Sequence, residues 1–144
     1  MPCDSFTRPF PYVEGATFDE TTFAYIGRPL VWSTNGAWHY VHVSPNARGD
    51  LGASAFFSSS SSLPSPYFLV RDDFSPTSWQ AFRLFAGTRG AAGWGDYIRT
   101  RAFEPSMLGW VTSVYTLGAT GAEPLFYILG RQRDIPSIAY WWPK

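Results

Sequence analysis

The chain has 144 residues, and its 11 Lys and Arg residues balance its 11 Asp and Glu residues. This length predicts a single domain over residues 1–144, since domains usually run to about 100–200 residues. Zero net charge argues against nucleic acid as a partner, because phosphate binding needs concentrated positive charge. An aromatic content of 19% argues against a disordered chain, because disorder requires few large apolar groups.

The cysteine content and the first residues bear on the cellular compartment. Cys3 is the only cysteine, which excludes an intrachain disulfide and a thiolate zinc cage. Asp4, Arg8 and two prolines interrupt the first ten residues, which therefore lack the pattern of a signal peptide. No stretch approaches the roughly 18 apolar residues of a membrane span. We expect a soluble cytoplasmic protein, although export by a route without a signal peptide fits the same sequence.

Short aromatic and β-branched runs alternate with structure breakers along the chain. Twelve prolines and thirteen glycines leave few intervals for a long helix. The runs between them are rich in Val, Tyr, Phe, Trp and Thr, which is typical of β-strands. The predicted strands cover residues 23–26, 38–43, 67–70, 110–117 and 125–129. The pattern predicts an all-β domain of antiparallel sheets, arranged as a sandwich or a barrel.

Two segments need separate treatment. Ser78 can cap a short helix that ends before Gly87 and carries aromatic residues on one face, but residues 78–86 also fit a strand. Residues 58–62 are a run of five serines followed by two prolines. This run predicts an exposed, flexible loop inside the domain.

An internal repeat relates two distant parts of the chain. Residues 15–28 align with residues 118–131 without a gap, and seven of fourteen positions are identical. In the same register Trp38 falls on Trp141. Each copy is predicted to form a turn, a strand, a tight Gly-Arg turn and a second aromatic strand. Repeated units usually bury their apolar faces against each other.

The repeat can be extended in two ways. In the first, the related segments span residues 15–41 and 118–144 and give a two-fold pseudo-repeat. In a looser register, three units begin at Trp38, Trp79 and Glu123. The three-fold register would suit a β-trefoil or a β-prism, and it stays open as the alternative.

A family resemblance rests on residues 109–111 and 118–131. They read Gly-Trp-Val and Gly-Ala-Thr-Gly-Ala-Glu-Pro-Leu-Phe-Tyr-Ile-Leu-Gly-Arg, which resembles the DM-nine repeat: Trp-Val, a glycine turn, and an aliphatic-Tyr-aliphatic strand ending near Arg. Residues 23–28, Phe-Ala-Tyr-Ile-Gly-Arg, are similar to the same strand. Some members of that family are all-β, mannose-binding lectins, so the resemblance implies a sugar-binding protein able to dimerise. The family's Gly-Gly-Lys-Glu segment is missing here, and its ligand contacts are not carried over.

The histidines, carboxylates and serines of the chain are not spaced in a way that would form a catalytic site or a metal site. His39 and His42 are the only histidines, and in an alternating strand they point to opposite faces and cannot share a metal ion. The adjacent carboxylates at 19–20 and 72–73 also diverge in a strand, which is unsuited to an acid–base pair. No Gly-x-Ser-x-Gly elbow marks a nucleophile. The sequence thus favours a non-catalytic role without a metal or cofactor.

Aromatic side chains with polar neighbours favour carbohydrate binding. A sugar packs its C–H face on Trp or Tyr rings while Asp, Glu and Arg bond to its hydroxyls. In an extended strand Trp38, Tyr40 and His42 share one face. Trp94 and Asp96 lie together on a glycine-rich segment. The predicted ligand-binding residues are Asp19, Arg28, Trp38, Tyr40, His42, Trp94, Asp96, Glu123, Arg131 and Trp141.

The resulting functional hypothesis is a non-catalytic lectin that binds glycans or glycoproteins. Several sites or a homodimer would supply avidity. Arg28 and Arg131 fit a structural role equally well, bonding to turn carbonyls. Two alternatives stay open. One is an aromatic-lined β-barrel acting as an enzyme or small-molecule binder. The other is a β-trefoil protein-binding module, such as a protease inhibitor that uses residues 58–66 as a wedge.

Overall fold

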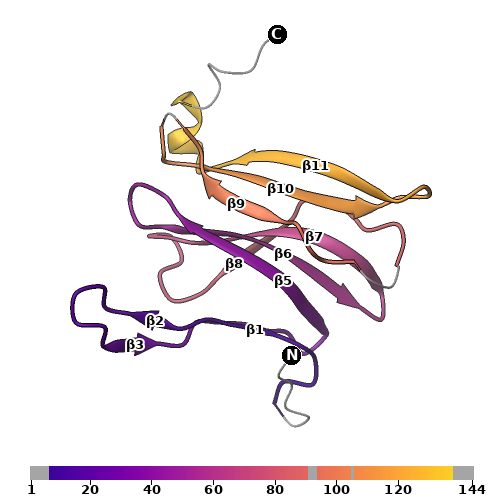
Figure 1. The fold of residues 1–144 in the computed structure, drawn as a ribbon, viewed down its shortest axis with the longest axis horizontal. Helices are drawn as coiled ribbons and strands as arrows, with labels where there is room; N and C mark the ends of the chain where they lie inside the picture. The colour runs from indigo at the N-terminus through magenta and orange to yellow at the C-terminus, as the bar shows by residue number, and fades with distance from the viewer. Residues whose placement is uncertain (1–6, 91–93, 105, 138–144) are drawn as a thin grey trace.

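The computed structural model describes residues 7–90, 94–104 and 106–137 (Figure 1). These residues form antiparallel β-sheets and one 3₁₀-helix, η1 (Gln132–Ser137), which confirms the all-β prediction. None of the described helical residues forms a segment long and apolar enough to cross a membrane.

The strands form two larger sheets and two short pairs. In chain order they are β1 (Val13–Glu14), β2 (Thr17–Phe18), β3 (Tyr25–Gly27), β4 (Leu30–Val31), β5 (Gly36–Pro45), β6 (Leu51–Ser59), β7 (Ser62–Arg71), β8 (Gln80–Arg83), β9 (Arg99–Ala102), β10 (Trp110–Leu117) and β11 (Ala122–Leu129). The larger sheets have the orders β5-β6-β7-β8 and β11-β10-β9. The short pairs are β1 with β4 and β2 with β3.

The two larger sheets pack face to face as a sandwich (Figure 1). Trp110 of β10 is 2% exposed and packs on Phe68 and Val70 of β7. Its indole N–H donates a hydrogen bond of 3.0 Å to the Ser44 carbonyl of β5. Gly52 of β6 makes room for the indole, since a Cβ at this position would lie 2.6 Å from the ring. One aromatic side chain thus contacts three strands of the opposite sheet.

The opposite face of the four-stranded sheet is covered by the N-terminal segment. Val13 and Val31 of the β1–β4 pair pack against a buried cluster on this face. The Trp38 ring lies at the centre of the cluster, 4.9 Å from the Phe57 ring and 5.3 Å from the Tyr67 ring between centroids. The buried members of the cluster are Trp38, Ala53, Ala55 and Leu69. The four-stranded sheet is therefore buried on both faces.

The predicted strands agree closely with the sheets. Residues 110–117 are β10 in full, and residues 38–43, 67–70 and 125–129 lie inside β5, β7 and β11. Residues 23–26 overlap β3 at their C-terminal half. Residues 78–86 contain β8 rather than a helix, because alternating pairs with β7 give its backbone hydrogen-bond partners.

The serine run is mostly strand, which corrects the predicted loop. β6 continues to Ser59 and β7 begins at Ser62, so that only Ser60 and Ser61 form the hairpin turn. Pairing of the flanking strands keeps these serines extended despite their turn-favouring side chains. The wedge-shaped inhibitor loop predicted over residues 58–66 is therefore not present.

The two segments of the repeat adopt different structures. Residues 15–28 form the short β2–β3 hairpin, whereas residues 118–131 turn once and then run straight through β11. Asp19 causes part of the difference, because its carboxylate accepts hydrogen bonds from the backbone N–H groups of Thr21 and Thr22 and closes a turn. The aligned residue Ala122 has no such side chain and pairs with β10. The predicted equivalence of the two segments is therefore wrong.

The sheet arrangement also decides between the fold alternatives. No sheet among the described residues closes into a barrel, so the structure is a sandwich. Sheets of four and three strands do not repeat around a three-fold axis. The barrel, trefoil and prism alternatives are therefore wrong.

The contact between Gly52 and Trp110 makes a testable prediction about stability. Gly52→Ala places a methyl group 2.6 Å from the indole, and we expect it to lower the free energy of unfolding by about 2 kcal/mol through overpacking. Urea unfolding followed by circular dichroism measures the change. Gly27→Ala is the control, since a Cβ there meets nothing within 4 Å. An equal effect of both substitutions would contradict the proposed packing role of Gly52.

Candidate functional site

A cleft lies where the segment 94–97 meets β10 and β11. Strand β9 pairs with β10 only from Trp110 to Ser113, so the later part of β10 leaves one edge free for this segment. The cleft has a volume of about 430 Å³. It is lined by Trp94, Gly95, Asp96, Tyr97, Ser113, Val114, Tyr115, Leu117, Ala122 and Pro124. We call it the aromatic cleft.

Ring contacts hold one side of the aromatic cleft in place. The Trp94 ring lies edge-on to the rings of Phe56, Tyr40 and His39, at centroid distances of 5.0, 5.6 and 5.8 Å. The Tyr115 ring packs on the other side of Phe56 at 5.2 Å. Edge-to-face pairs each add about 0.5–1.5 kcal/mol beyond burial. Trp94 is thus an anchor of the cleft wall rather than a free platform.

Gly95 brings the backbone against the aromatic wall. Its φ of +121° lies in a region that side chains rarely adopt, and a Cβ at this position would collide with the Tyr40 ring. Its N–H donates a hydrogen bond to the Tyr115 hydroxyl. Burial raises the pKa of Tyr115, so this phenol stays protonated at neutral pH. The Tyr115 O–H therefore remains available as a donor.

Tyr97 and Asp96 stand at the mouth of the aromatic cleft. The Tyr97 side chain is 95% exposed although its ring is large and apolar. Its backbone has a φ of +68°, and Tyr40, whose ring packs against Gly95 and Trp94, has +50°. Left-handed backbone at a bulky residue costs about 1–3 kcal/mol, and such strain gathers at functional sites. Asp96 is also exposed and precedes Tyr97 in the lining of the cleft.

A β-bulge in β5 overturns the predicted orientation of the two histidines. His39 pairs with Phe56 and His42 pairs with Ser54. Two residues of β5, Tyr40 and Val41, therefore lie opposite one residue of β6. The alternation shifts by one position, and both imidazoles lie on the face that Phe56 and Ser54 share. The prediction that they point to opposite faces is wrong.

Both histidines are engaged by neighbouring polar groups. His39 Nε2 lies 2.9 Å from the Ser58 hydroxyl, and burial lowers the pKa of His39. His42 Nδ1 accepts a hydrogen bond of 3.2 Å from the Thr100 backbone N–H. Across the described part of the chain, no three His, Cys, Asp or Glu side chains come together as metal ligands.

The same bulge separates the three residues of the predicted aromatic strip. Trp38 is 7% exposed and belongs to the core under the β1–β4 pair. His42 lies on the opposite face of the sheet, beside β9. Of the three, Tyr40 alone contacts Trp94, a residue that lines the aromatic cleft. The prediction of one shared binding face for Trp38, Tyr40 and His42 is therefore wrong.

The acidic and basic candidates of the repeat do not line the aromatic cleft. Asp19 closes the β2–β3 turn. Arg28 lies 3.4 Å from the Glu14 carboxylate. Glu123 of β11 folds over the β10–β11 turn against Gly118. Trp141 lies outside the described residues.

Arg131 forms an ion pair at the opposite end of the sandwich. Its Nε and Nη2 atoms donate to the two Asp72 oxygens at 2.5 and 2.8 Å, and Nη2 also donates to the Gln80 amide oxygen. The Asp72 side chain is 1% exposed, and the guanidinium lowers the pKa of this carboxyl. Arg133 forms a second ion pair with Asp73, which follows Asp72 in the chain. These pairs attach the start of η1 to the β7–β8 connection, which is a structural role.

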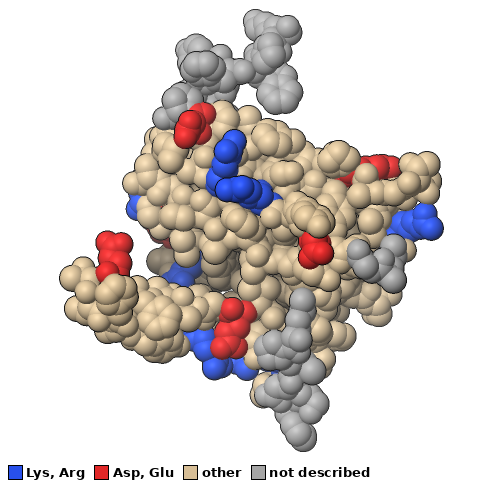
Figure 2. All heavy atoms as spheres, in the orientation of Figure 1, with Lys and Arg blue, Asp and Glu red and all other residues tan. Residues whose placement is uncertain are grey.

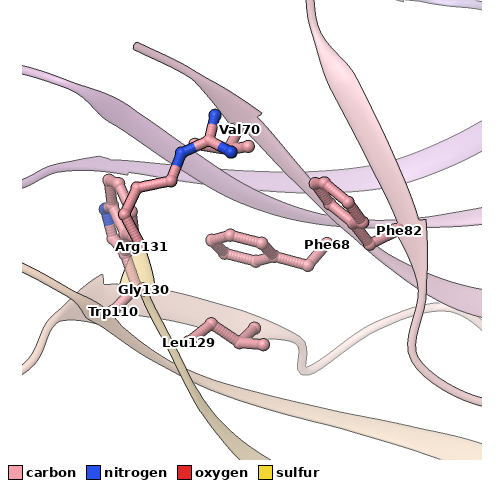
Figure 3. Close-up of a pocket in the computed structure, with 7 residues that line it drawn as sticks. All are labelled: Phe68, Val70, Phe82, Trp110, Leu129, Gly130 and Arg131. Carbon is pink, nitrogen blue, oxygen red and sulfur yellow. The ribbon is translucent and has the colours of Figure 1, made fainter. Parts of the chain in front are cut away.

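Arg131 also borders an apolar pocket between the two sheets (Figure 3). Its volume is about 250 Å³. The lining side chains come from β7, β8, β10 and the end of β11, and include two phenyl rings and one indole (Figure 3). They are Phe68, Val70, Phe82, Trp110, Leu129, Gly130 and Arg131. We call this cavity the apolar pocket.

Comparison with protein-family models, curated proteins and solved structures finds no match for this chain. The resemblance to the DM-nine repeat therefore stays a prediction.

The structure assembles part of the predicted site and adds residues that the sequence did not single out. Trp94 and Asp96 line the aromatic cleft, and Tyr40 supports it through its ring contact with Trp94. Tyr97 follows Asp96 directly, and this position next to a predicted site residue could have identified it as part of the site. Tyr115 is distant from this segment in the sequence, and none of its neighbouring residues indicated that it belongs to the site.

The buried ion pair predicts a pH-dependent stability. The folded pKa of Asp72 is lowered, so its contribution is present above the unfolded pKa of about 3.9 and is lost as pH falls through the lower folded value. Asp72→Asn leaves Arg131 without its charge partner and should cost about 3 kcal/mol at pH 7. The cost should shrink below pH 4, as measured by urea unfolding. Asp73→Asn, at a 57% exposed side chain, is the control and should change little. A pH-independent cost of Asp72→Asn would contradict this account.

Proposed function

We propose that this chain binds carbohydrate without catalysis, in the aromatic cleft. The observation that carries the proposal is the Tyr97 ring, which is 95% exposed and lines the same cleft as Asp96. Strained backbone holds this ring out at the cleft mouth. An exposed ring next to a hydrogen-bonding acid is the combination that a sugar requires.

The cleft offers a sugar both kinds of contact. Its C–H face would stack on Tyr97, whose ring contributes area at a small entropic cost. Asp96 would accept hydrogen bonds from hydroxyl groups, and a bond to a charged acceptor is roughly twice as strong as a neutral one. The Tyr115 hydroxyl would donate from the cleft wall. Three groups on two chain segments thus define the position of one sugar ring.

The surface charge agrees with a neutral ligand. On the face shown in Figure 2, acidic and basic side chains are scattered singly among uncharged groups. The formal net charge of the chain is zero. A surface of this kind favours recognition by ring stacking and local hydrogen bonds over long-range attraction.

Removing the exposed ring tests the proposal. A glycan array first identifies a sugar that binds the wild-type chain, and titration calorimetry then gives its affinity. Tyr97→Ala should weaken binding at least tenfold, because the stacking surface is lost. Phe126→Ala is the matched control, since that ring is 66% exposed on β11 and lies outside the aromatic cleft. An array without any binding, or equal losses in both variants, would overturn the proposal.

A second candidate function, binding of a small apolar molecule, is favoured by the apolar pocket. Its lining is almost entirely hydrocarbon, and Asp72 neutralises the guanidinium at its border. An engineered cavity of about 150 Å³ holds benzene, so a volume of about 250 Å³ accommodates a small aromatic molecule.

This candidate has its own test. Phe82→Glu places a charge in the lining at a half-exposed position and should weaken binding of a neutral naphthalene dye more than tenfold, measured by dye fluorescence. Phe85→Glu, 42% exposed and outside the pocket lining, is the control. Dye binding that survives Phe82→Glu would reject the pocket as its site.

A further inference from the structure

An unpartnered apolar hairpin stands apart from the sandwich. The β2–β3 pair, with its turn, forms an arm over residues 17–27 that lies beside the two large sheets (Figure 1). Four large side chains on it are more than half exposed: Phe18 (55%), Phe23 (80%), Tyr25 (58%) and Ile26 (64%). Exposed apolar groups gathered on one element mark an interaction surface.

The tip of the arm carries its most exposed ring on strained backbone. Phe23 has a φ of +55°, where Asn, Asp or Gly is the favoured residue. Its N–H donates to the Asp19 carbonyl, so the tight turn is itself well formed. A non-glycine residue at this position carries backbone strain, and an exposure of 80% leaves the phenyl ring little packing against the described residues to offset it. The ring is therefore placed for contact with another surface.

A cleft at the base of the arm is shaped to receive such a ring. It lies between residues 29–32 and the four-stranded sheet, and Figure 2 shows the surface hollowed between the arm and the rest of the molecule. Its volume is about 370 Å³. Three indoles line it, those of Trp32, Trp38 and Trp79. We call it the tryptophan cleft; none of residues 17–27 lines it, so the chain's own arm does not fill it.

Charges on the two surfaces are complementary. The arm turn carries Asp19 and Glu20, and its own N–H and hydroxyl groups lower the pKa of Asp19, which keeps that carboxyl ionised. Arg71 lines the tryptophan cleft, and its Nε donates to the neutral Pro76 carbonyl at 2.8 Å. Arg83 is exposed on β8 near the cleft lining. Within the described residues, neither arginine forms an ion pair.

We infer that the arm of one copy docks in the tryptophan cleft of a second copy, and that the exchange is reciprocal. A two-fold dimer forms when each arm reaches the cleft of the other chain, whereas a contact made in one direction only would propagate into a ring or a filament. The three exposed rings of one arm present roughly 400 Å² of surface, since an aromatic side chain offers about 200 Å². With these rings fully covered, two docked arms and the surfaces facing them would bury at most about 1,600 Å², which is within the range of a standard stable interface. This inference is independent of the aromatic cleft.

Sedimentation velocity of the full chain over a wide concentration range tests the inference. We expect a dimer that Phe23→Asp dissociates, with a dissociation constant at least a hundredfold higher, because the substitution enters the symmetric interface twice. Asp suits the left-handed backbone at this position, so the hairpin is preserved. Ala81→Trp should have the same effect by filling the tryptophan cleft, which Ala81 lines. Phe126→Asp, at a 66% exposed ring on β11, should leave the dimer intact.

A mixing experiment identifies the two surfaces as partners. The Phe23→Asp chain keeps its cleft and the Ala81→Trp chain keeps its arm, so an equimolar mixture should regain a heterodimer through one intact contact. The inference is overturned by a wild-type chain that stays monomeric at all concentrations. It is also overturned by variants that do not complement each other, or by a dimer that Phe126→Asp dissociates and Phe23→Asp does not.

Discussion

The contact between the Trp110 indole and the bare backbone at Gly52 holds the two sheets of this protein together. The indole lies over β6, packs on β7 and donates its N–H to β5. Because protein cores are close-packed, this one contact sets the spacing between the sheets. The position of β10 follows from it, and with β10 the edge against which residues 94–97 lie. The aromatic cleft thus depends on packing in the core beneath it.

The bulge at Tyr40 and Val41 is the second determinant of the site. It brings Tyr40 to the Trp94 ring and turns His42 to the face that His39 already shares with Phe56. Without it, the regular alternation of β5 would carry Tyr40 to the face where Trp38 is buried. A local backbone irregularity therefore places a ring of β5 against two residues, Trp94 and Gly95, that line the aromatic cleft.

The strands could be predicted from the sequence because the residues in each run have a high intrinsic preference for extended backbone. Residues 110–117 are the clearest case, since β-branched and aromatic side chains fill the entire run. Side-chain direction was predicted less well, because the bulge in β5 depends on pairing with β6 and leaves no mark in the residues themselves. The repeat failed for a related reason: similar residues at 15–28 and 118–131 meet different partners, and pairing with β10 decides the structure of the second. Tyr115 could not be assigned to the site, because only the fold brings it to Gly95.

Residues 95–97 form the proposed sugar contact, and backbone NMR tests this contact most directly. The experiment is a titration of the ¹⁵N-labelled chain with a panel of monosaccharides, followed through the amide resonances. The account predicts saturable shifts at Gly95, Asp96 and Tyr97, with the amide of Trp79 in the tryptophan cleft unchanged. Shifts centred on another surface, or a spectrum that no sugar alters, would contradict it.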